Sequence, residues 1–145
     1  MGKHAVRFLL LLAVLSFPHV AKASMIKAYF SDFAVTGPQR GEEMQRGLKA
    51  LLASRLGDAL ILSVDTPAEA DILVSGSYVE FGAVFSMDAV AKNSTGAFLA
   101  RAFVQGEGKG ELIPSLEMLA RDLADQVRKA YPLPSVPQAA SSSPR

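Results

Sequence analysis

The chain has 145 residues, of which half are hydrophobic, with 15 basic residues against 14 acidic ones and no cysteine. The lack of cysteine excludes disulfide bonds, thiol nucleophiles, cysteine-held zinc and a lipid-modified cysteine. The near-balanced charge gives no electrostatic argument for nucleic acid or for an anionic membrane surface as a partner.

The first 23 residues have the pattern of an export signal. Lys3 and Arg7 give it a positive start, residues 8–17 form an almost continuous apolar segment, and Ala-Lys-Ala at 21–23 is a small-x-small cleavage site. We therefore expect cleavage between residue 23 and Ser24, and export to the periplasm or the outer membrane. An apolar segment of about ten residues is shorter than the roughly twenty that span a bilayer, so we expect no direct membrane anchor.

Cleavage at this site would also change the chemistry that remains. Both histidines, His4 and His19, would be lost with three positive charges, leaving 122 residues with 12 basic and 14 acidic side chains. Histidine-dependent triads and tetrahedral zinc sites would then lack their side chains. The remaining length suffices for one domain with a single hydrophobic core.

The first half of this domain alternates between strand and helix patterns. Residues 25–35 alternate loosely between apolar and polar side chains, which predicts a strand. Apolar residues then recur at helical spacing and predict an amphipathic helix that ends at Gly57 and Asp58. Residues 59–64 predict a short buried strand, and residues 65–70 a brief helical turn. The apolar stripe of the first helix consists of Met44, Leu48, Leu51, Leu52 and Leu56.

The second half predicts a meander of three strands followed by a long helix. Residues 72–81, 84–91 and 97–105 have strand length, with turn composition between them. In the second strand Phe85 and the alternate residues after it predict one buried face. The stripe of the last helix consists of Leu116, Leu119, Ala120, Leu123, Val127 and Tyr131.

These elements predict an α/β (α+β) domain over residues 24–131. Its order is β-α-β-(short helix)-β-β-β-α, with two long helices packed on a mixed sheet of about five strands. Residues 132–145 are rich in Pro, Ser and Ala and are expected to form a disordered tail. The signal, residues 1–23, completes the predicted organisation.

A glycine-rich segment, Gly106-x-Gly108-x-Gly110, precedes the last helix. Glycine-rich loops in this position can hold phosphate at a helix N-terminus. A dinucleotide fingerprint would place its third glycine where Glu111 stands, so the pattern favours a flexible connection instead.

Three carboxylates flank the predicted sheet and are the candidates for catalytic acids. They are Asp71, Glu80 and Asp88. A carboxylate-pair mechanism needs two acids held across a substrate in a cleft, whereas solvated strand ends are the simpler interpretation. Nothing resembles the acidic loop of a dedicated calcium site. We assign no catalytic, cofactor-binding or metal-binding residue and expect a protein that is not an enzyme.

Four phenylalanines of the meander have two possible roles. They could form an exposed contact surface if one sheet face were uncovered, but core packing is the favoured expectation for most of them. The same region contains Asn93-Ser94-Thr95, which matches both a glycosylation acceptor and ordinary turn composition. The phenylalanines are Phe81, Phe85, Phe98 and Phe103.

Three stretches give the chain a recognisable resemblance. Gly47-Leu48 through Ser54-Arg55-Leu56 resembles a first helix, residues 70–77 (ADILVSGS) resemble the entry to a central strand, and residues 112–120 resemble a last helix. Together they are similar to the exported α/β domain of the group that includes the TolB N-terminal domain, FlgO, CsgG-like and LpoB-like proteins. The version that precedes β-propeller repeats in bacterial surface proteins is especially similar.

The resemblance implies a non-enzymatic role as a protein-interaction domain in envelope or surface-structure assembly. The partners it implies are other envelope proteins, among them a separate β-propeller chain or an outer-membrane component, and a second copy of the chain. Two alternatives stay open: a small-ligand-binding or carboxylate-dependent enzyme module, and a subunit of an oligomeric surface fibre or pore.

Overall fold

The computed structural model describes residues 25–38 and 41–131, so the expected signal and the expected tail lie outside the described residues. The order of elements follows the prediction, with the first strand divided in two and a second short helix before the last long one. Two 3-10 helices cover Pro67–Glu69 and Lys109–Glu111. The other elements are β1 (Ile26–Phe30), β2 (Ala34–Thr36), α1 (Gly41–Asp58), β3 (Ile61–Ser63), β4 (Ile72–Phe81), β5 (Val84–Asn93), β6 (Phe98–Glu107) and α2 (Leu112–Ala130).

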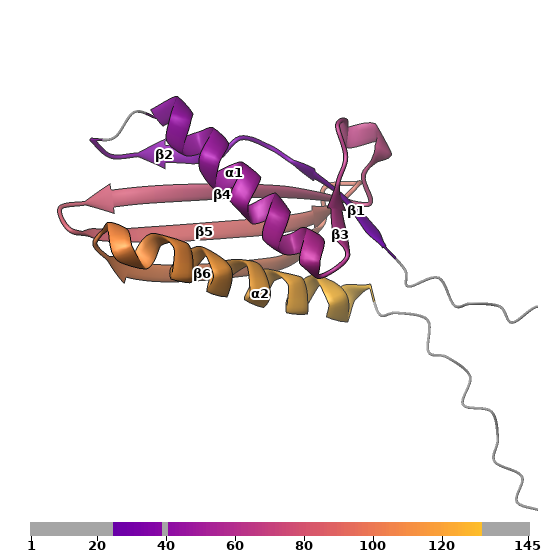
Figure 1. Cartoon of the computed structure of the whole chain (residues 1–145). Helices are drawn as coiled ribbons and strands as arrows, with labels where there is room; N and C mark the ends of the chain where they lie inside the picture. The colour runs from indigo at the N-terminus through magenta and orange to yellow at the C-terminus, as the bar shows by residue number, and fades with distance from the viewer. Residues whose placement is uncertain (1–24, 39–40, 132–145) are drawn as a thin grey trace, which may run out of the picture.

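The strands form one six-stranded mixed sheet in the order β3-β1-β4-β5-β6, with β2 also paired to β4 (Figure 1). The pairs β1–β3, β1–β4 and β2–β4 are parallel, whereas β4–β5–β6 is an antiparallel meander. The parallel pairs are joined through helices, as such connections require. The predicted fold class, two helices on a mixed sheet, is confirmed.

The single strand predicted over residues 25–35 is wrong in one respect, because the structure divides it into β1 and β2. Phe30 is opposite Val74 and Ala34 is opposite Ser77, so this segment uses one residue more than β4 does. The irregularity turns Phe33 into the core, where it is 2% exposed. Gly76 makes room for its ring, since a Cβ on that glycine would lie 2.3 Å from Phe33 Cζ.

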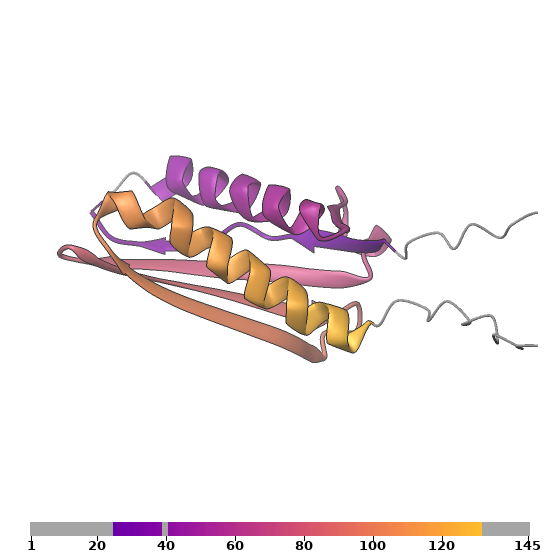
Figure 2. The ribbon, with the colours of Figure 1, turned by 60° about the horizontal axis from the view of Figure 1, so that its bottom comes forward.

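Both long helices cover the same face of the sheet, and no described element covers the other face (Figure 2). The predicted stripes face the sheet: Leu48, Leu52 and Leu56 of α1 are buried, and α2 buries five predicted apolar positions of its own. Each buried leucine or valine side chain contributes about 1.5–3 kcal/mol through removal from water. The α2 positions that are buried, including two outside the predicted stripe, are Ser115, Leu116, Leu119, Ala120, Leu123, Ala124 and Val127.

The sheet surface beneath α2 is made of small side chains. On the inner face of β5 and β6, the alanines are at most 4% exposed. Short side chains let the helix backbone approach the sheet closely, and α2 packs mainly on β6. These alanines are Ala89, Ala91, Ala100 and Ala102.

The two helices are also joined to each other by polar contacts. Arg55 of α1 and Glu117 of α2 form an ion pair at 2.9 Å. Near the end of α2, the guanidinium of Arg128 donates a hydrogen bond to the carbonyl of Ala59. Ala59 and Leu60 form the turn after α1, and therefore β3 begins at Ile61 rather than at residue 59.

The glycine segment before α2 is not the flexible connection that the sequence predicts. Gly106 belongs to β6 and lies under the ring of Phe85, where an added Cβ would be 2.4 Å from Cζ. Gly108 turns the chain at a φ of +72°, and its N–H donates to the carbonyl of Ala83 at 2.7 Å. Ring packing and a left-handed turn therefore explain these two glycines.

Gly76→Ala should destabilise the protein by about 1–3 kcal/mol, because the added methyl group meets the aromatic ring of Phe33 in a filled core. The matched control is Gly47→Ala on α1, where nothing lies within 4 Å of the new Cβ and the change favours the helix. Urea denaturation of both variants measures the effect. Equal stability of Gly76→Ala and the unchanged protein would contradict the packing of Phe33 described above.

Candidate interaction surface

Three of the four phenylalanines of the meander lie outside the core, which corrects the expectation of core packing for most of them. Phe85 alone of the four is buried, whereas Phe81, Phe98 and Phe103 are 89%, 64% and 54% exposed. Alternation along β4 and β6 turns Phe81 and Phe103 away from the helices. Phe98 is paired with Lys92 after a register shift and also lies outside the core.

Four exposed apolar side chains lie on the outer face of the meander, and three of them lie near the β4–β5 turn. Val79 and Phe81 of β4 are both exposed, and Phe81 is directly opposite Val84 of β5. Phe103 lies on the next strand, β6, opposite Asp88. We call Val79, Phe81, Val84 and Phe103 the outer apolar patch. Exposed apolar groupings on a soluble domain mark interaction sites more often than isolated exposed residues do.

The three carboxylates singled out in the sequence do not converge. Asp71 stands at the start of β4, where its Oδ2 accepts a hydrogen bond from the Lys27 N–H at 2.9 Å. Glu80 stands at the other end of the same strand, and Asp88 forms an ion pair with Arg101 at 2.6 Å on β5 and β6. These three acids therefore form no carboxylate pair across a cleft.

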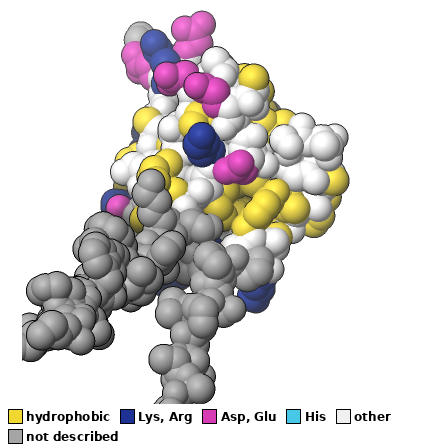
Figure 3. Space-filling view, turned by 90° about the vertical axis from the view of Figure 1, so that its right-hand side faces the viewer, with side chains coloured by type: hydrophobic (Ala, Val, Ile, Leu, Met, Phe, Trp, Pro, Cys, Tyr) yellow, Lys and Arg dark blue, Asp and Glu magenta, His cyan; other side chains and the backbone are white. Residues whose placement is uncertain are grey.

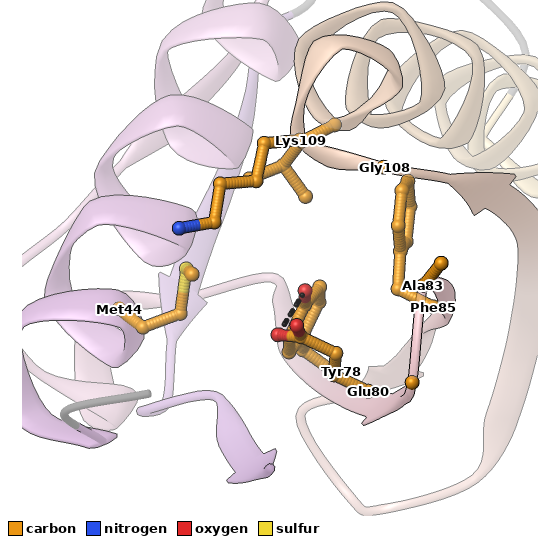
Figure 4. Close-up of a pocket in the computed structure, with 9 residues that line it drawn as sticks. Met44, Tyr78, Glu80, Ala83, Phe85, Gly108 and Lys109 are labelled. Carbon is orange, nitrogen blue, oxygen red and sulfur yellow. Dashed lines mark hydrogen bonds between the residues drawn. The ribbon is translucent and has the colours of Figure 1, made fainter. Parts of the chain in front are cut away.

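A pocket of about 300 Å³ lies between the start of α1, the β4–β5 turn and the β6–α2 connection. Its walls are mostly apolar, and Figure 4 shows Tyr78 and Glu80 on one side with Lys109 on the other. The Tyr78 hydroxyl donates to Glu80 Oε2 at 3.0 Å, and the Tyr78 ring stacks on Phe85 with centroids 5.8 Å apart. The lining residues are Met44, Tyr78, Glu80, Gly82, Ala83, Phe85, Gly108, Lys109 and Leu112.

The pocket brings together residues that sequence reasoning did not connect. Alternation in β4 places Tyr78 on the inner face, but no local signal brings Lys109 across the pocket from Glu80. Burial, the hydrogen bond to Glu80 and the negative charge of Glu80 raise the pKa of Tyr78 to about 12. Tyr78 thus stays a neutral hydrogen-bond donor in the physiological range.

Asn93 serves the turn between β5 and β6. Its side-chain oxygen accepts hydrogen bonds from the backbone N–H groups of Thr95 and Ala97, at 3.1 Å and 2.8 Å, and from the Thr95 hydroxyl at 2.7 Å. This arrangement is an Asx-type turn and accounts for the Asn-Ser-Thr sequence on structural grounds.

The described residues include no cluster suited to a metal ion. No group of three or more Asp, Glu, His or Cys side chains in the described part of the chain could hold a metal ion. On the face shown in Figure 3, basic and acidic side chains lie near each other beside hydrophobic ones. Neither α1 nor α2 is long and apolar enough to cross a membrane.

Comparison with known proteins places the fold but not the family. No family model matches the chain, and no curated protein matches it. Among solved structures, the PelC dodecamer from Paraburkholderia phytofirmans is similar, with a TM-score of 0.52, 15% identity, and coverage of 71% of this chain and 88% of that one. A lipoprotein from Neisseria meningitidis gives a TM-score of 0.50, 14% identity, and coverage of 72% and 98%.

TolB from Acinetobacter baumannii has the same fold in part of its length. The TM-score is 0.52 at 13% identity, with 77% of this chain but only 30% of TolB covered. TolB belongs to the group that the sequence resembles, so the resemblance is supported at the level of the fold. At these identities, membership of one particular group within that fold is not established.

The environment of Tyr78 predicts a specific dependence on high pH. Its pKa is higher in the folded protein than the value of 10.0 for a free tyrosine, so its stabilising contribution is complete below about pH 10 and is lost as the pH rises toward 12. A tyrosinate absorbance titration should show a step near pH 12 that Tyr78→Phe removes. Glu80→Gln should lower that pKa only partly, since burial is the larger cause.

Denaturation at several pH values completes this test. The stability advantage of the unchanged protein over Tyr78→Phe should shrink between about pH 10 and 12. A Tyr78 that titrates near 10 in the folded protein would contradict the buried, hydrogen-bonded arrangement.

Proposed function

We propose that this chain is a non-enzymatic protein-interaction domain that acts in bacterial envelope or surface-structure assembly, in the periplasm or at the outer membrane. The observation that carries the proposal is the outer apolar patch on a sheet face that no described element covers. Burial of these apolar side chains against a second protein is favourable, because it removes them from water.

Several features support an envelope setting. The first 23 residues have the pattern of an export signal, and the sequence is similar to exported envelope domains. The solved structures that share the fold include a lipoprotein and TolB. A role outside catalysis is supported by the separation of Asp71, Glu80 and Asp88.

Self-association is the second candidate, and one comparison favours it. PelC, which shares the fold, is described as a dodecamer. A second copy of this chain is therefore a partner to be tested beside other envelope proteins. In either case aromatic side chains such as Phe81 and Phe103 are the expected anchors of the contact, because they bury a large area at low entropic cost.

Capture from envelope extracts, combined with light scattering, tests this proposal. The purified protein should recover a defined partner or form a defined oligomer. The double variant Phe81→Ser and Phe103→Ser should reduce recovery or association about tenfold or more, as loss of anchor side chains does. The matched control is Met118→Ser, which removes an exposed apolar side chain of α2 on the helix side of the molecule.

Two outcomes would contradict the proposal. One is a monodisperse monomer that recovers no protein from the extract. The other is a double variant that binds as well as the unchanged protein and the Met118→Ser control.

A further inference from the structure

The sheet ends on one side in a long edge strand, β6, which runs for ten residues. An antiparallel edge of this length offers a row of backbone donors and acceptors to any other strand. The opposite side of the sheet ends in β3, which has three residues and therefore few backbone groups for pairing. The β6 edge is therefore the place where strand pairing with a second protein would be expected.

Side chains of α2 and of the 3-10 helix before it already form hydrogen bonds with the backbone of this edge. Gln126 of α2 accepts a hydrogen bond from the Arg101 N–H at 3.2 Å and donates one to the Arg101 carbonyl at 2.7 Å. The amide thus supplies the same donor and acceptor that a neighbouring strand would supply. At the other end of β6, Glu111 Oε2 accepts from the Glu107 N–H at 2.7 Å.

The spacing of these contacts determines which backbone groups of β6 remain available for strand pairing. Backbone groups of a strand point alternately to either side, and Arg101 and Glu107 both point away from β5. Of the positions between them, only Phe103 and Gln105 share this direction. Because these two residues alternate with Val104, they would hold a partner strand of only about three residues, the short end of the 3–10 residues of ordinary strands.

We infer that the β6 edge is a latent strand-pairing surface that Gln126, with Glu111, keeps closed to a second copy of this chain. The second copy is the relevant occupant because an antiparallel β6–β6 pair would match two identical ten-residue strands about a two-fold axis. A closed edge leaves the outer face of the sheet as the surface available for specific contacts.

The fold brings these residues together through the position of α2. The helix crosses the inner face beside β6 in both views of the ribbon (Figures 1 and 2), and its packing on that strand places Gln126 at the edge. Gln126 and Arg101 are 25 residues apart, so the contact exists only in the folded chain.

Amide hydrogen exchange of the purified protein tests the first half of the inference. In the unchanged protein the Arg101 amide should exchange about tenfold more slowly than those of Phe103 and Gln105. Gln126→Ala should remove this difference, since one hydrogen bond to the backbone is lost. Asp125→Ala is the matched control, because Asp125 is the exposed neighbour of Gln126 on α2.

Light scattering over a range of concentrations tests the second half. Gln126→Ala should associate beyond the state of the unchanged protein, and the amides of Phe103 and Gln105 should become protected as it does. Gln126→Glu keeps an acceptor for the Arg101 N–H but loses the donor, so it should associate to an intermediate degree. If Gln126→Ala does not fold, the association of Gln126→Glu tests the inference instead.

Three results would overturn the inference. They are unchanged exchange at Arg101 in Gln126→Ala, no added association in a folded Gln126 variant, and equal association in the Asp125→Ala control. None of them depends on the outer apolar patch, so this test and the capture experiment fail or succeed separately.

Discussion

Burial of two helices on the same face of a single sheet is the constraint on which the rest of this structure depends. The chain has no cysteine, so packing must supply the stability that cross-links give to some exported domains. Leu52 of α1 and Leu119 and Leu123 of α2 are fully buried against the strands. Because both stripes need the same apolar surface, the helices lie side by side and the other sheet face stays open.

The arrangement of α2 has consequences at both faces of the meander. Alanines under the helix allow it to approach the sheet closely, and larger side chains such as Phe103 are accommodated on the opposite face. The same approach places Gln126 against the backbone of Arg101 at the sheet edge. One packing choice therefore exposes an aromatic surface and closes a strand edge, which favours recognition through side chains over recognition by strand addition.

The elements were largely predictable because their patterns are local. The leucines of α1 and α2 recur at helical spacing, and Phe85 alternates with polar neighbours, so the helices and the buried face of β5 follow from the sequence. The division of β1 from β2 did not follow, because the extra residue is defined only by pairing with β4. Which phenylalanines are exposed could not be predicted from the alternation alone, because both faces of β6 carry apolar residues. The inner face is the one with small side chains, since α2 packs closely on it, and Phe103 therefore lies on the outer face.

The sequence by itself determined the fold class, the order of elements and the absence of cysteine chemistry, since these depend on composition and on spacing along the chain. The tertiary structure alone decided the location of the candidate surfaces. The pocket joins Met44, Glu80 and Lys109, and the edge contact joins Arg101 to Gln126. The residues within each set are far apart in sequence, and their side chains meet because two helices share one face of the sheet.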